Sequence, residues 1–299
     1  MSASLPVATT ALELDDLLSQ ARDRGEKVAL VATMGALHEG HLSLVDAAKQ
    51  QAEFVVVSIF VNPTQFGAGE DFDKYPRTLE QDLAKLEGIA SAVFAPSVET
   101  VYPGANATSP TVAAAALASG VVTPRLAGPV GKTFEGAARP GHFDGMLTVV
   151  GRLFDLVKPD VAVFGEKDAQ QLFLIQRMVD EHYPQIEIVA AETVREPSGL
   201  ALSSRNRFLN AEQTDIAEIL AITLATVDQL IHEKMPVAEA LNIGREMIAG
   251  EPETKLEYLE LVDLATFEPI GERHPAQALL IVAAIVGNVR LIDNHHIKL

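Results

Sequence analysis

The stretch from Val28 to Ala48 constrains the fold more than any other part of the chain. It begins with Val28–Val31, a short apolar run that is typical of a strand buried on both faces. The pattern breaks at Thr33–Gly35, and apolar residues spaced near 3.6 then predict a helix: Leu42, Leu44, Val45 and Ala48. A buried strand that leads through a glycine-containing turn into a helix directs backbone N–H groups and the positive end of the helix dipole to one place. The stretch therefore predicts a phosphate-binding turn.

Two histidines, His38 and His41, lie in this turn. Gly40 between them lets a ligand approach the backbone closely. A zinc-protease motif is excluded, because HExxH places its histidines at i and i+4 whereas these lie at i and i+3. A plainer interpretation stays open from the spacing alone, in which the histidines are helix caps or surface residues.

Strands and helices alternate through the first part of the chain. We expect strands at 54–61, 92–95, 161–164 and 186–190, and helices at 11–24, 79–86, 143–157 and 169–181. Such alternation is typical of a doubly wound, Rossmann-like α/β fold with a parallel sheet. Ligands bind beyond the carboxyl ends of the strands in these sheets, where the histidine turn and the Asn62–Gln65 loop are both expected.

Beyond Pro197 the pattern changes. The expected elements are helices at 211–232 and 237–249, a strand at 257–262, and a hairpin of 278–286 with 289–292 about Gly287-Asn288. We therefore predict two domains, a Rossmann-like one at 1–193 and a smaller α+β C-terminal one at 194–299. The segment 102–141 is rich in Ala, Gly, Pro, Ser and Thr, and predicts a loop with a short strand over 111–116.

Charge and composition exclude several classes of protein. The formal net charge of −18 argues against nonspecific binding to nucleic acid, which requires clustered Lys and Arg. No apolar run approaches the roughly 18 residues of a membrane span, and no secretory signal is evident. The absence of cysteine excludes disulfides, thiolate catalysis and cysteine zinc sites, and fits a cytoplasmic location.

Four long segments, in order, resemble one enzyme family. They are TMGALHEGHLSLV (33–45), SIFVNPTQFGAGEDFDKYPRT (58–78), RPGHFDGMLTVVGRLFDLVKPDVAVFGEKDAQQLFLIQRMV (139–179) and TVREPSGLALSSRNRFL (193–209). The chain is thereby similar to the pantothenate synthetases, which belong to the HIGH-motif nucleotidyltransferases. The resemblance implies a nucleotide- and pantoate-binding first domain, a lid-like second domain and a homodimer.

The resemblance also implies which residues bind ATP. These are Met34, Gly35, Ala36, Leu37, His38, Glu39, Gly40, His41, Gly165, Glu166, Lys167, Asp168, Val194, Leu202, Ser203, Ser204 and Arg205. Six of them are implied to be catalytic: His38, His41, Lys167, Ser203, Ser204 and Arg205. From the residues alone, FGEKD (164–168) is equally well a solvated Lys-Asp pair at a helix start, and SSRN (203–206) a capping turn before Ala211.

Further positions match the acid- and amine-binding part of the family's site. Gln65 and Gln171 match pantoate-binding positions, and amides suit hydroxyl and carboxylate recognition because each offers a donor and an acceptor. Other matching positions are Asn62, Tyr75, Arg139 and His142. Asp82 lies where the family has acidic residues sometimes linked to magnesium, but its neighbour is Gln81, so we expect Mg²⁺ to be carried by the ATP phosphates. Ala32 stands where the family commonly has proline.

The implied activity is ATP-dependent joining of (R)-pantoate and β-alanine through a pantoyl-adenylate, with release of AMP and pyrophosphate. Two alternatives stay open at this point. One is another HIGH-type nucleotidyltransferase, which would keep the nucleoside monophosphate in its product. The other is a homologue that binds ATP or pantoate without turnover.

Overall fold

The computed structural model describes residues 4–66, 72, 75–104, 120, 122–270 and 277–298. Its contacts divide the chain into two compact units, Met1–Gly165 with Leu174–Ala191, and Glu166–Phe173 with Glu192–Leu299. Residues 166–173 belong to the second unit, whereas the sequence predicts them in the first domain. The segments 166–168 and 194–205, both expected to bind ATP, therefore belong to the second unit.

The first unit contains a six-stranded sheet whose neighbouring strands are all parallel. Its strands are β1 (Val7–Ala8), β2 (Val28–Thr33), β3 (Phe54–Ile59), β4 (Ala92–Phe94), β5 (Val161–Gly165) and β6 (Glu187–Ala191). Their order across the sheet is β1-β4-β3-β2-β5-β6. From β2 the chain builds the sheet outward through β3 and β4, then returns to place β5 on the other side of β2. The β2–β5 pair is therefore the topological switch point, where doubly wound sheets bind ligands.

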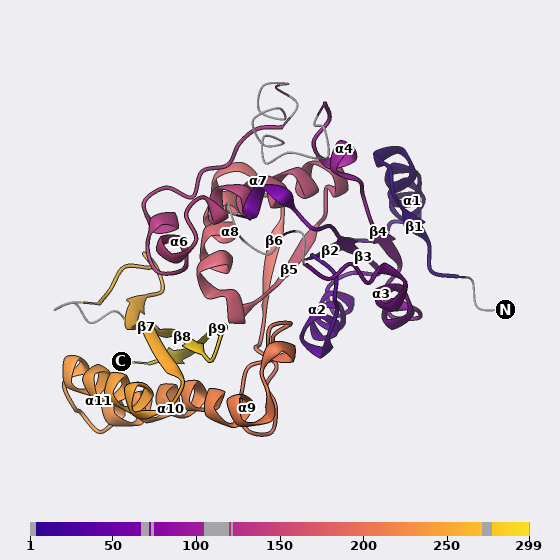
Figure 1. The fold of residues 1–299 in the computed structure, drawn as a ribbon. Coiled ribbons are helices and arrows are strands. Elements are labelled where there is room, and N and C mark those ends of the chain that lie inside the picture. Colours follow the sequence, from indigo (N-terminus) through magenta and orange to yellow (C-terminus); the bar gives the residue numbers. More distant parts are fainter. Residues whose placement is uncertain are drawn as a thin grey trace. The chain divides into compact units, whose positions relative to one another are not determined.

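Helices and short 3-10 turns connect these strands (Figure 1). The helices are α1 (Ala11–Asp23), α2 (Glu39–Lys49), α3 (Leu79–Leu86), α4 (Val98–Val101), α6 (Glu135–Ala138), α7 (His142–Val157) and α8 (Ala169–His182). The 3-10 turns are η1 (Pro63–Gln65), η3 (Val130–Lys132) and η4 (Glu166–Asp168).

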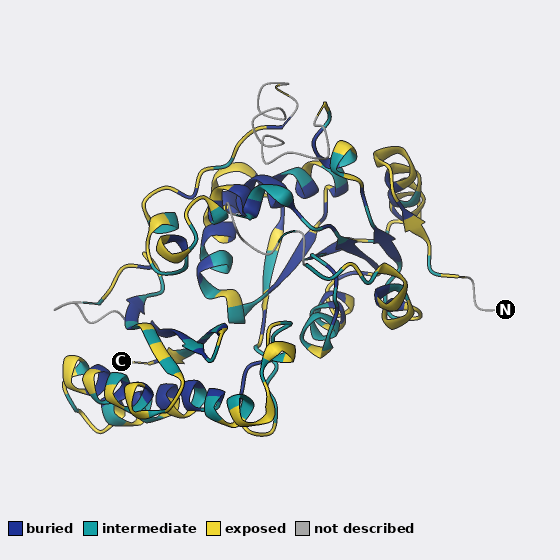
Figure 2. Ribbon diagram, viewed as in Figure 1, coloured by how far each residue is buried: buried dark blue, intermediate teal, exposed yellow. Residues whose placement is uncertain are grey.

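The centre of the sheet is buried on both faces, as Figure 2 shows in dark blue. On one face, Ala29 and Val31 of β2 share a hydrophobic cluster with Val45 and Ala48 of α2. The alternate residues of β2 are equally buried and point to the opposite face, because successive side chains of a strand alternate. In Figure 1, α2 lies on one side of β2 and α7 on the other. This double cover explains the continuous apolar run at the start of β2.

The second unit has an antiparallel three-stranded sheet of order β7-β8-β9. Its elements are η5 (Asn206–Phe208), α9 (Ala211–Ala217), α10 (Ile219–His232), α11 (Val237–Gly250), β7 (Thr254–Asp263), β8 (Ala278–Val286) and β9 (Val289–Ile297). Residues of α10, α11 and all three strands form one hydrophobic core. At Gly244 in α11, an added Cβ would lie 2.7 Å from Leu259 and from Val227, so glycine permits close packing of α11 on the sheet and on α10.

The predicted fold class is confirmed: a doubly wound parallel sheet accompanied by a smaller α+β unit. The single helix expected at 211–232 was wrong, because the chain breaks at Glu218 into α9 and α10, and the Glu218 N–H bonds to Asp215 three residues back. The two-residue β1 was not expected. The predicted strand at 111–116 lies outside the described residues. Among the residues that are described, no helix has the length and apolarity that crossing a bilayer requires.

Candidate active site

The histidine turn follows β2 at the topological switch point. β2 pairs with β5 in parallel register from Ala29 opposite Val161 to Val31 opposite Val163, so the carboxyl ends of both strands lie at the same edge of the sheet. β5 ends at Gly165, and a Cβ added there would meet only Leu44 of α2, at 3.7 Å. The edge therefore combines the amino end of α2 with a strand end that carries no side chain.

The turn before α2 needs an unusual backbone. Gly35 and Ala36 both have positive φ, of 82° and 52°, and the Thr33 hydroxyl accepts a hydrogen bond from the Gly35 N–H at 3.2 Å. A Cβ on Gly35 would lie 3.1 Å from a carboxylate oxygen of Asp82. Glycine therefore suits both the backbone conformation and the limited space at this position.

Asp82 holds this turn from α3. Its carboxylate is 1% exposed and accepts the Ala36 N–H at 3.0 Å, the Leu37 N–H at 2.8 Å and the Thr78 hydroxyl at 3.0 Å. The ammonium of Lys85, one helical turn later, donates to the Leu37 carbonyl. These contacts give Asp82 a structural role and do not fit a magnesium ligand. Within the described ranges, no cluster of three His, Asp or Glu side chains suits a metal ion.

His38 and His41 are fixed by backbone hydrogen bonds. His38 is the N-cap of α2, where its Nδ1 accepts the Gly40 N–H at 3.2 Å, and Nδ1 of His41 accepts the His38 N–H at 3.3 Å. The two ring centroids lie 4.1 Å apart. Because Nδ1 is the acceptor in both rings, each neutral imidazole carries its proton on Nε2. Helix capping and ligand binding are thus compatible, since these backbone hydrogen bonds use Nδ1 of each ring and not Nε2.

Asn62 and Gln65 lie after β3, and their amides are joined. Nδ2 of Asn62 donates to Oε1 of Gln65 at 3.1 Å and to the Gly145 carbonyl of α7 at 3.2 Å. With Oε1 so used, the Gln65 Nε2 is directed to the Met34 sulfur, at 3.1 Å. Gln65 therefore presents its donor end beside the histidine turn.

Tyr102 was not singled out in the sequence, yet it orients Asn62. Its hydroxyl donates to Oδ1 of Asn62 at 2.8 Å, and its side chain is fully buried. Burial raises the pKa of Tyr102 to about 12, so the phenol keeps its proton and its role as a donor. A buried tyrosine at the end of a short helix gives no sequence signal that distinguishes it from ordinary core.

His142 and Arg139 approach the same loop. An Arg139 N–H lies 3.2 Å from Nε2 of His142, and Nδ1 of His142 lies 2.9 Å from the Gln65 carbonyl. Since a guanidinium only donates, Nε2 accepts and the neutral ring donates from Nδ1. Tyr75 packs edge-on against Phe66, next to Gln65, with ring centroids 5.8 Å apart. The structure thus brings together Asn62, Gln65, Arg139 and His142, and places Tyr75 beside them.

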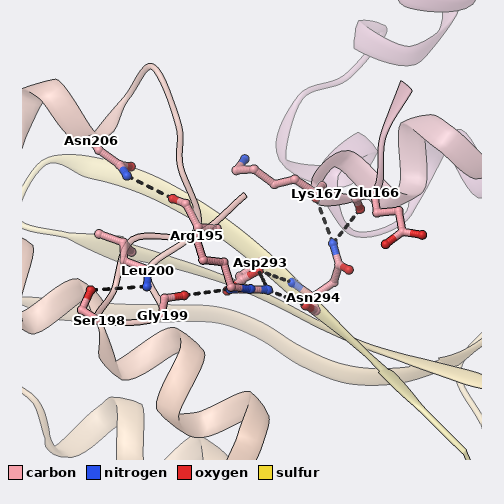
Figure 3. A network of polar contacts seen from close by, with 10 residues as sticks. Glu166, Lys167, Arg195, Ser198, Gly199, Leu200, Asn206, Asp293 and Asn294 are labelled. Atoms are coloured by element: carbon pink, nitrogen blue, oxygen red, sulfur yellow. Dashed lines mark hydrogen bonds and ion pairs between the residues drawn. The ribbon is translucent and has the colours of Figure 1, made fainter. Parts of the chain in front are cut away.

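In the second unit, η4 carries Lys167. The Lys167 Nζ lies 3.8 Å from an Asp168 carboxylate oxygen, as the plainer interpretation expects. The carbonyls of Glu166 and Lys167 both accept from the side chain of Asn294 in β9, each at 2.9 Å (Figure 3). Gln171 is half-buried on α8 in the same unit, and its pantoate contact stays a prediction.

Residues 194–202 form a hairpin in the second unit. The Leu202 N–H donates to the Val194 carbonyl at 2.9 Å, and the Glu196 N–H to the Leu200 carbonyl at 2.9 Å. Ser203–Arg205 follow directly, with Arg205 exposed and its N–H 3.2 Å from the Ser203 hydroxyl. The interpretation of 203–206 as a helix cap was wrong, because the N-cap of α9 is Asn210.

A family model described as pantoate-beta-alanine ligase matches residues 6–296 of this chain. The chain belongs to this family. A pantothenate synthetase of Leifsonia xyli is 50% identical over 274 residues, which is 91% of this chain and 90% of that protein. The family resemblance seen in the sequence is confirmed.

Solved structures of the family have the same fold. The pantothenate synthetase of Thermus thermophilus matches with a TM-score of 0.86 and 42% identity, over 97% of this chain and 99% of that one. The pantoate-beta-alanine ligase of Francisella tularensis, solved in complex with β,γ-ATP and β-alanine, matches with a TM-score of 0.72 and 33% identity, over 97% of each chain.

Proposed function

We infer that this chain condenses (R)-pantoate with β-alanine at the expense of ATP, through a pantoyl-adenylate, and releases AMP and pyrophosphate. Membership in the pantoate–β-alanine ligase family carries the inference. The paired histidines at the amino end of α2, at the β2–β5 switch point, agree with it because that position suits the phosphates of a nucleotide.

The first step requires positioning more than proton transfer. A pantoate carboxylate oxygen attacks the α-phosphorus of ATP, and the bond to the pyrophosphate oxygen breaks. The carboxylate is already an anion, so no general base is required. Negative charge grows on the leaving pyrophosphate and must be stabilised by donors and cations. The Nε2–H groups of His38 and His41 supply donors fixed in advance by their Nδ1 hydrogen bonds.

We assign the other ligand contacts on the family resemblance. Lys167, Ser203, Ser204 and Arg205 bind the phosphates. The other residues that bind ATP are those that the family resemblance implies. Gln65 and Gln171 bind pantoate, and the part of the site that takes pantoate and β-alanine is also lined by Asn62, Tyr75, Arg139 and His142. The linked amides of Asn62 and Gln65 support this assignment, because they fix which end of Gln65 is the donor.

In the second step the deprotonated amine of β-alanine attacks the acyl carbon of the adenylate. The C–N bond forms, the bond to AMP breaks, and the amine gives up a proton. The mixed anhydride must be shielded from water during this step. We assign that shielding to closure of the loop 203–206, in keeping with the lid role implied for the C-terminal domain.

Magnesium, the homodimer and the cytoplasmic location stay predictions. We propose that Mg²⁺ enters as part of the ATP substrate and is held by its phosphates, because the contacts of Asp82 do not fit a metal ligand.

The test is the dependence of each product on each substrate. Pyrophosphate release from ATP is expected to require (R)-pantoate, and AMP release is then expected to require β-alanine. A product that retains the nucleoside monophosphate would instead favour another HIGH-type nucleotidyltransferase. Binding of ATP and pantoate without pyrophosphate release would favour a non-catalytic homologue.

A further inference from the structure

Two adjacent polar residues are buried on the last strand of the second unit. Asp293 and Asn294 of β9 are 4% and 5% exposed. Their neighbours along the strand include buried Leu291 and Ile297, which belong to the hydrophobic core. Burying polar groups is costly unless they are hydrogen-bonded, so the partners of this pair explain its presence.

Asn294 binds the backbone of the Lys167 segment. Its Nδ2 donates both hydrogens, one to the Glu166 carbonyl and one to the Lys167 carbonyl, each at 2.9 Å (Figure 3). The two carbonyls belong to η4, a single 3-10 turn. Asn294 thus fixes the backbone from which the Lys167 side chain extends, and it leaves the ammonium to other partners.

Asp293 binds the hairpin that precedes Ser203. Its carboxylate accepts two hydrogen bonds from the Arg195 guanidinium, at 2.6 and 2.9 Å. The same guanidinium donates to the Gly199 carbonyl at 2.9 Å and to the Asn294 carbonyl at 3.2 Å. A bidentate Arg–carboxylate pair fixes direction as well as distance. The hairpin is therefore held at its first strand and at its turn.

We propose that Asp293 and Asn294 are positioning residues that hold two ATP-binding segments, 166–168 and 194–202, in one fixed arrangement. All of these residues lie in the second unit. The proposal rests on the proposed function, which assigns Lys167 and Ser203–Arg205 to the phosphates. Transition-state stabilisation by such groups depends on placement fixed before the reaction, and small displacements cost large factors in rate.

A purely structural role for the pair makes a different prediction. If Asn294 only stabilised the fold, its loss would lower thermal stability and leave the Michaelis constants of the folded enzyme unchanged. If it positions Lys167, its loss selectively affects ATP use. Kinetics for each substrate therefore separate the two roles.

The experiment compares variants of Asn294 in the full-length protein. Asn294→Asp keeps the shape but sets an oxygen against two carbonyl oxygens, and Asn294→Ala removes the donors without adding charge. Asn294→Gln retains the carboxamide and is expected to recover part of the loss. The matched control on the same strand is Arg290→Gln, which removes the hydrogen bond from Arg290 Nε to Glu257 at 2.7 Å.

For Asn294→Asp and Asn294→Ala we expect KM for ATP to rise, or single-turnover pyrophosphate release to slow, by about tenfold or more, in line with leaving two partly buried acceptors unpaired. KM for pantoate and for β-alanine should change by less than about threefold, and Arg290→Gln should change none of these constants. If Asn294→Asp does not fold, Asn294→Ala and Asn294→Gln provide the same comparison.

Equal effects on all three substrates, or no effect of Asn294→Ala on ATP use, would overturn the proposal. Wild-type enzyme that releases no pyrophosphate from ATP and pantoate would overturn the proposed function instead. The two failures are therefore distinguishable in one series of assays.

Discussion

The turn before α2 and the hairpin at 194–202 are both held by a buried carboxylate from another part of the sequence, but the carboxylates are satisfied differently. Asp82 accepts two backbone N–H groups and a hydroxyl, all uncharged donors. Asp293 is paired with the guanidinium of Arg195. The uncharged donors leave the negative charge of Asp82 beside a turn that is expected to receive phosphates. The guanidinium of Arg195, by contrast, neutralises the charge of Asp293. Hydrogen bonds from uncharged groups thus hold the turn before α2 (the first loop), whereas an ion pair holds the hairpin at 194–202 (the second loop).

The largest effect is expected on the rate of adenylate formation, when a histidine of the turn before α2 is removed. His41→Ala removes an Nε2–H donor and should lower the single-turnover rate of adenylate formation about 10²- to 10³-fold, as does loss of one oxyanion donor. The matched control is His232→Ala, at an exposed position on α10, which should leave the rate unchanged. Near-normal adenylate formation by His41→Ala would remove His41 from the proposed machinery.

The second prediction concerns the ion pair of the second loop. Arg195→Met leaves the Asp293 carboxylate buried without its cation and should lower the free energy of unfolding by about 3 to 5 kcal/mol. Arg195→Lys retains the charge but loses the fork, and should cost less. Chemical denaturation measures both. Equal losses for the two variants would contradict the importance of bidentate geometry.

The corresponding change in the first loop is expected to cost less, because it leaves no unpaired charge. Asp82→Ala leaves the Ala36 and Leu37 N–H groups without their hydrogen-bond acceptor and should lower the free energy of unfolding by about 2 to 4 kcal/mol. A loss clearly greater than that of Arg195→Met would reverse the comparison. Unchanged stability would show that solvent replaces the carboxylate.

A smaller effect is expected where α7 contacts the Asn62–Gln65 loop. A Cβ added to Gly145 would overlap the Thr64 carbonyl and lie 2.8 Å from the Gln65 nitrogen. Gly145→Ala should therefore cost about 1 to 3 kcal/mol of stability by overpacking, and should raise KM for pantoate more than KM for ATP. Steady-state kinetics with each substrate varied decide this, and a selective rise in KM for ATP would argue against the assignment of Gln65.

The smallest structural effect is expected at Gly165. An added Cβ there meets only Leu44, at 3.7 Å, so Gly165→Ala should change the free energy of unfolding by no more than about 0.5 kcal/mol. Any rise in KM for ATP would then report close approach of the nucleotide to this strand end. Normal ATP saturation would show that the nucleotide does not need the missing side chain.

The sequence predicts the parallel sheet because its central strands, β2, β3 and β5, are apolar runs separated by clear helical periods. It also predicts the histidine turn, where Gly35, His38 and His41 give a local signal. It does not predict the break at Glu218, since no glycine or proline marks it and the helical pattern continues on both sides.

The residues that position the site were the hardest to predict. Asp82 and Tyr102 act on loops some 40 residues away, and Asn294 acts on carbonyls more than 120 residues away. Their partners are mostly backbone groups, which leave no trace in the sequence. Asp293 and Asn294 give no signal of their own, because they begin a run of four polar residues, 293–296, that follows Leu291 and Ile292.

Two sets of contacts, here called clamps, hold the site: those of Asp82 with the turn before α2, and those of Asp293 and Asn294 with the segments 166–168 and 194–202. The positions of these residues along the sequence have a consequence for how the protein is made. During synthesis on a ribosome, the turn at residues 33–38 can acquire its clamp as soon as α3 has emerged, since Asp82 is encoded soon after it. The segments at 166–168 and 194–202 can be held only after β9 has been synthesised, about a hundred codons after the segments themselves. We therefore expect the turn that carries the histidine pair to order before the Lys167 segment, because Asp82 is synthesised before Asn294.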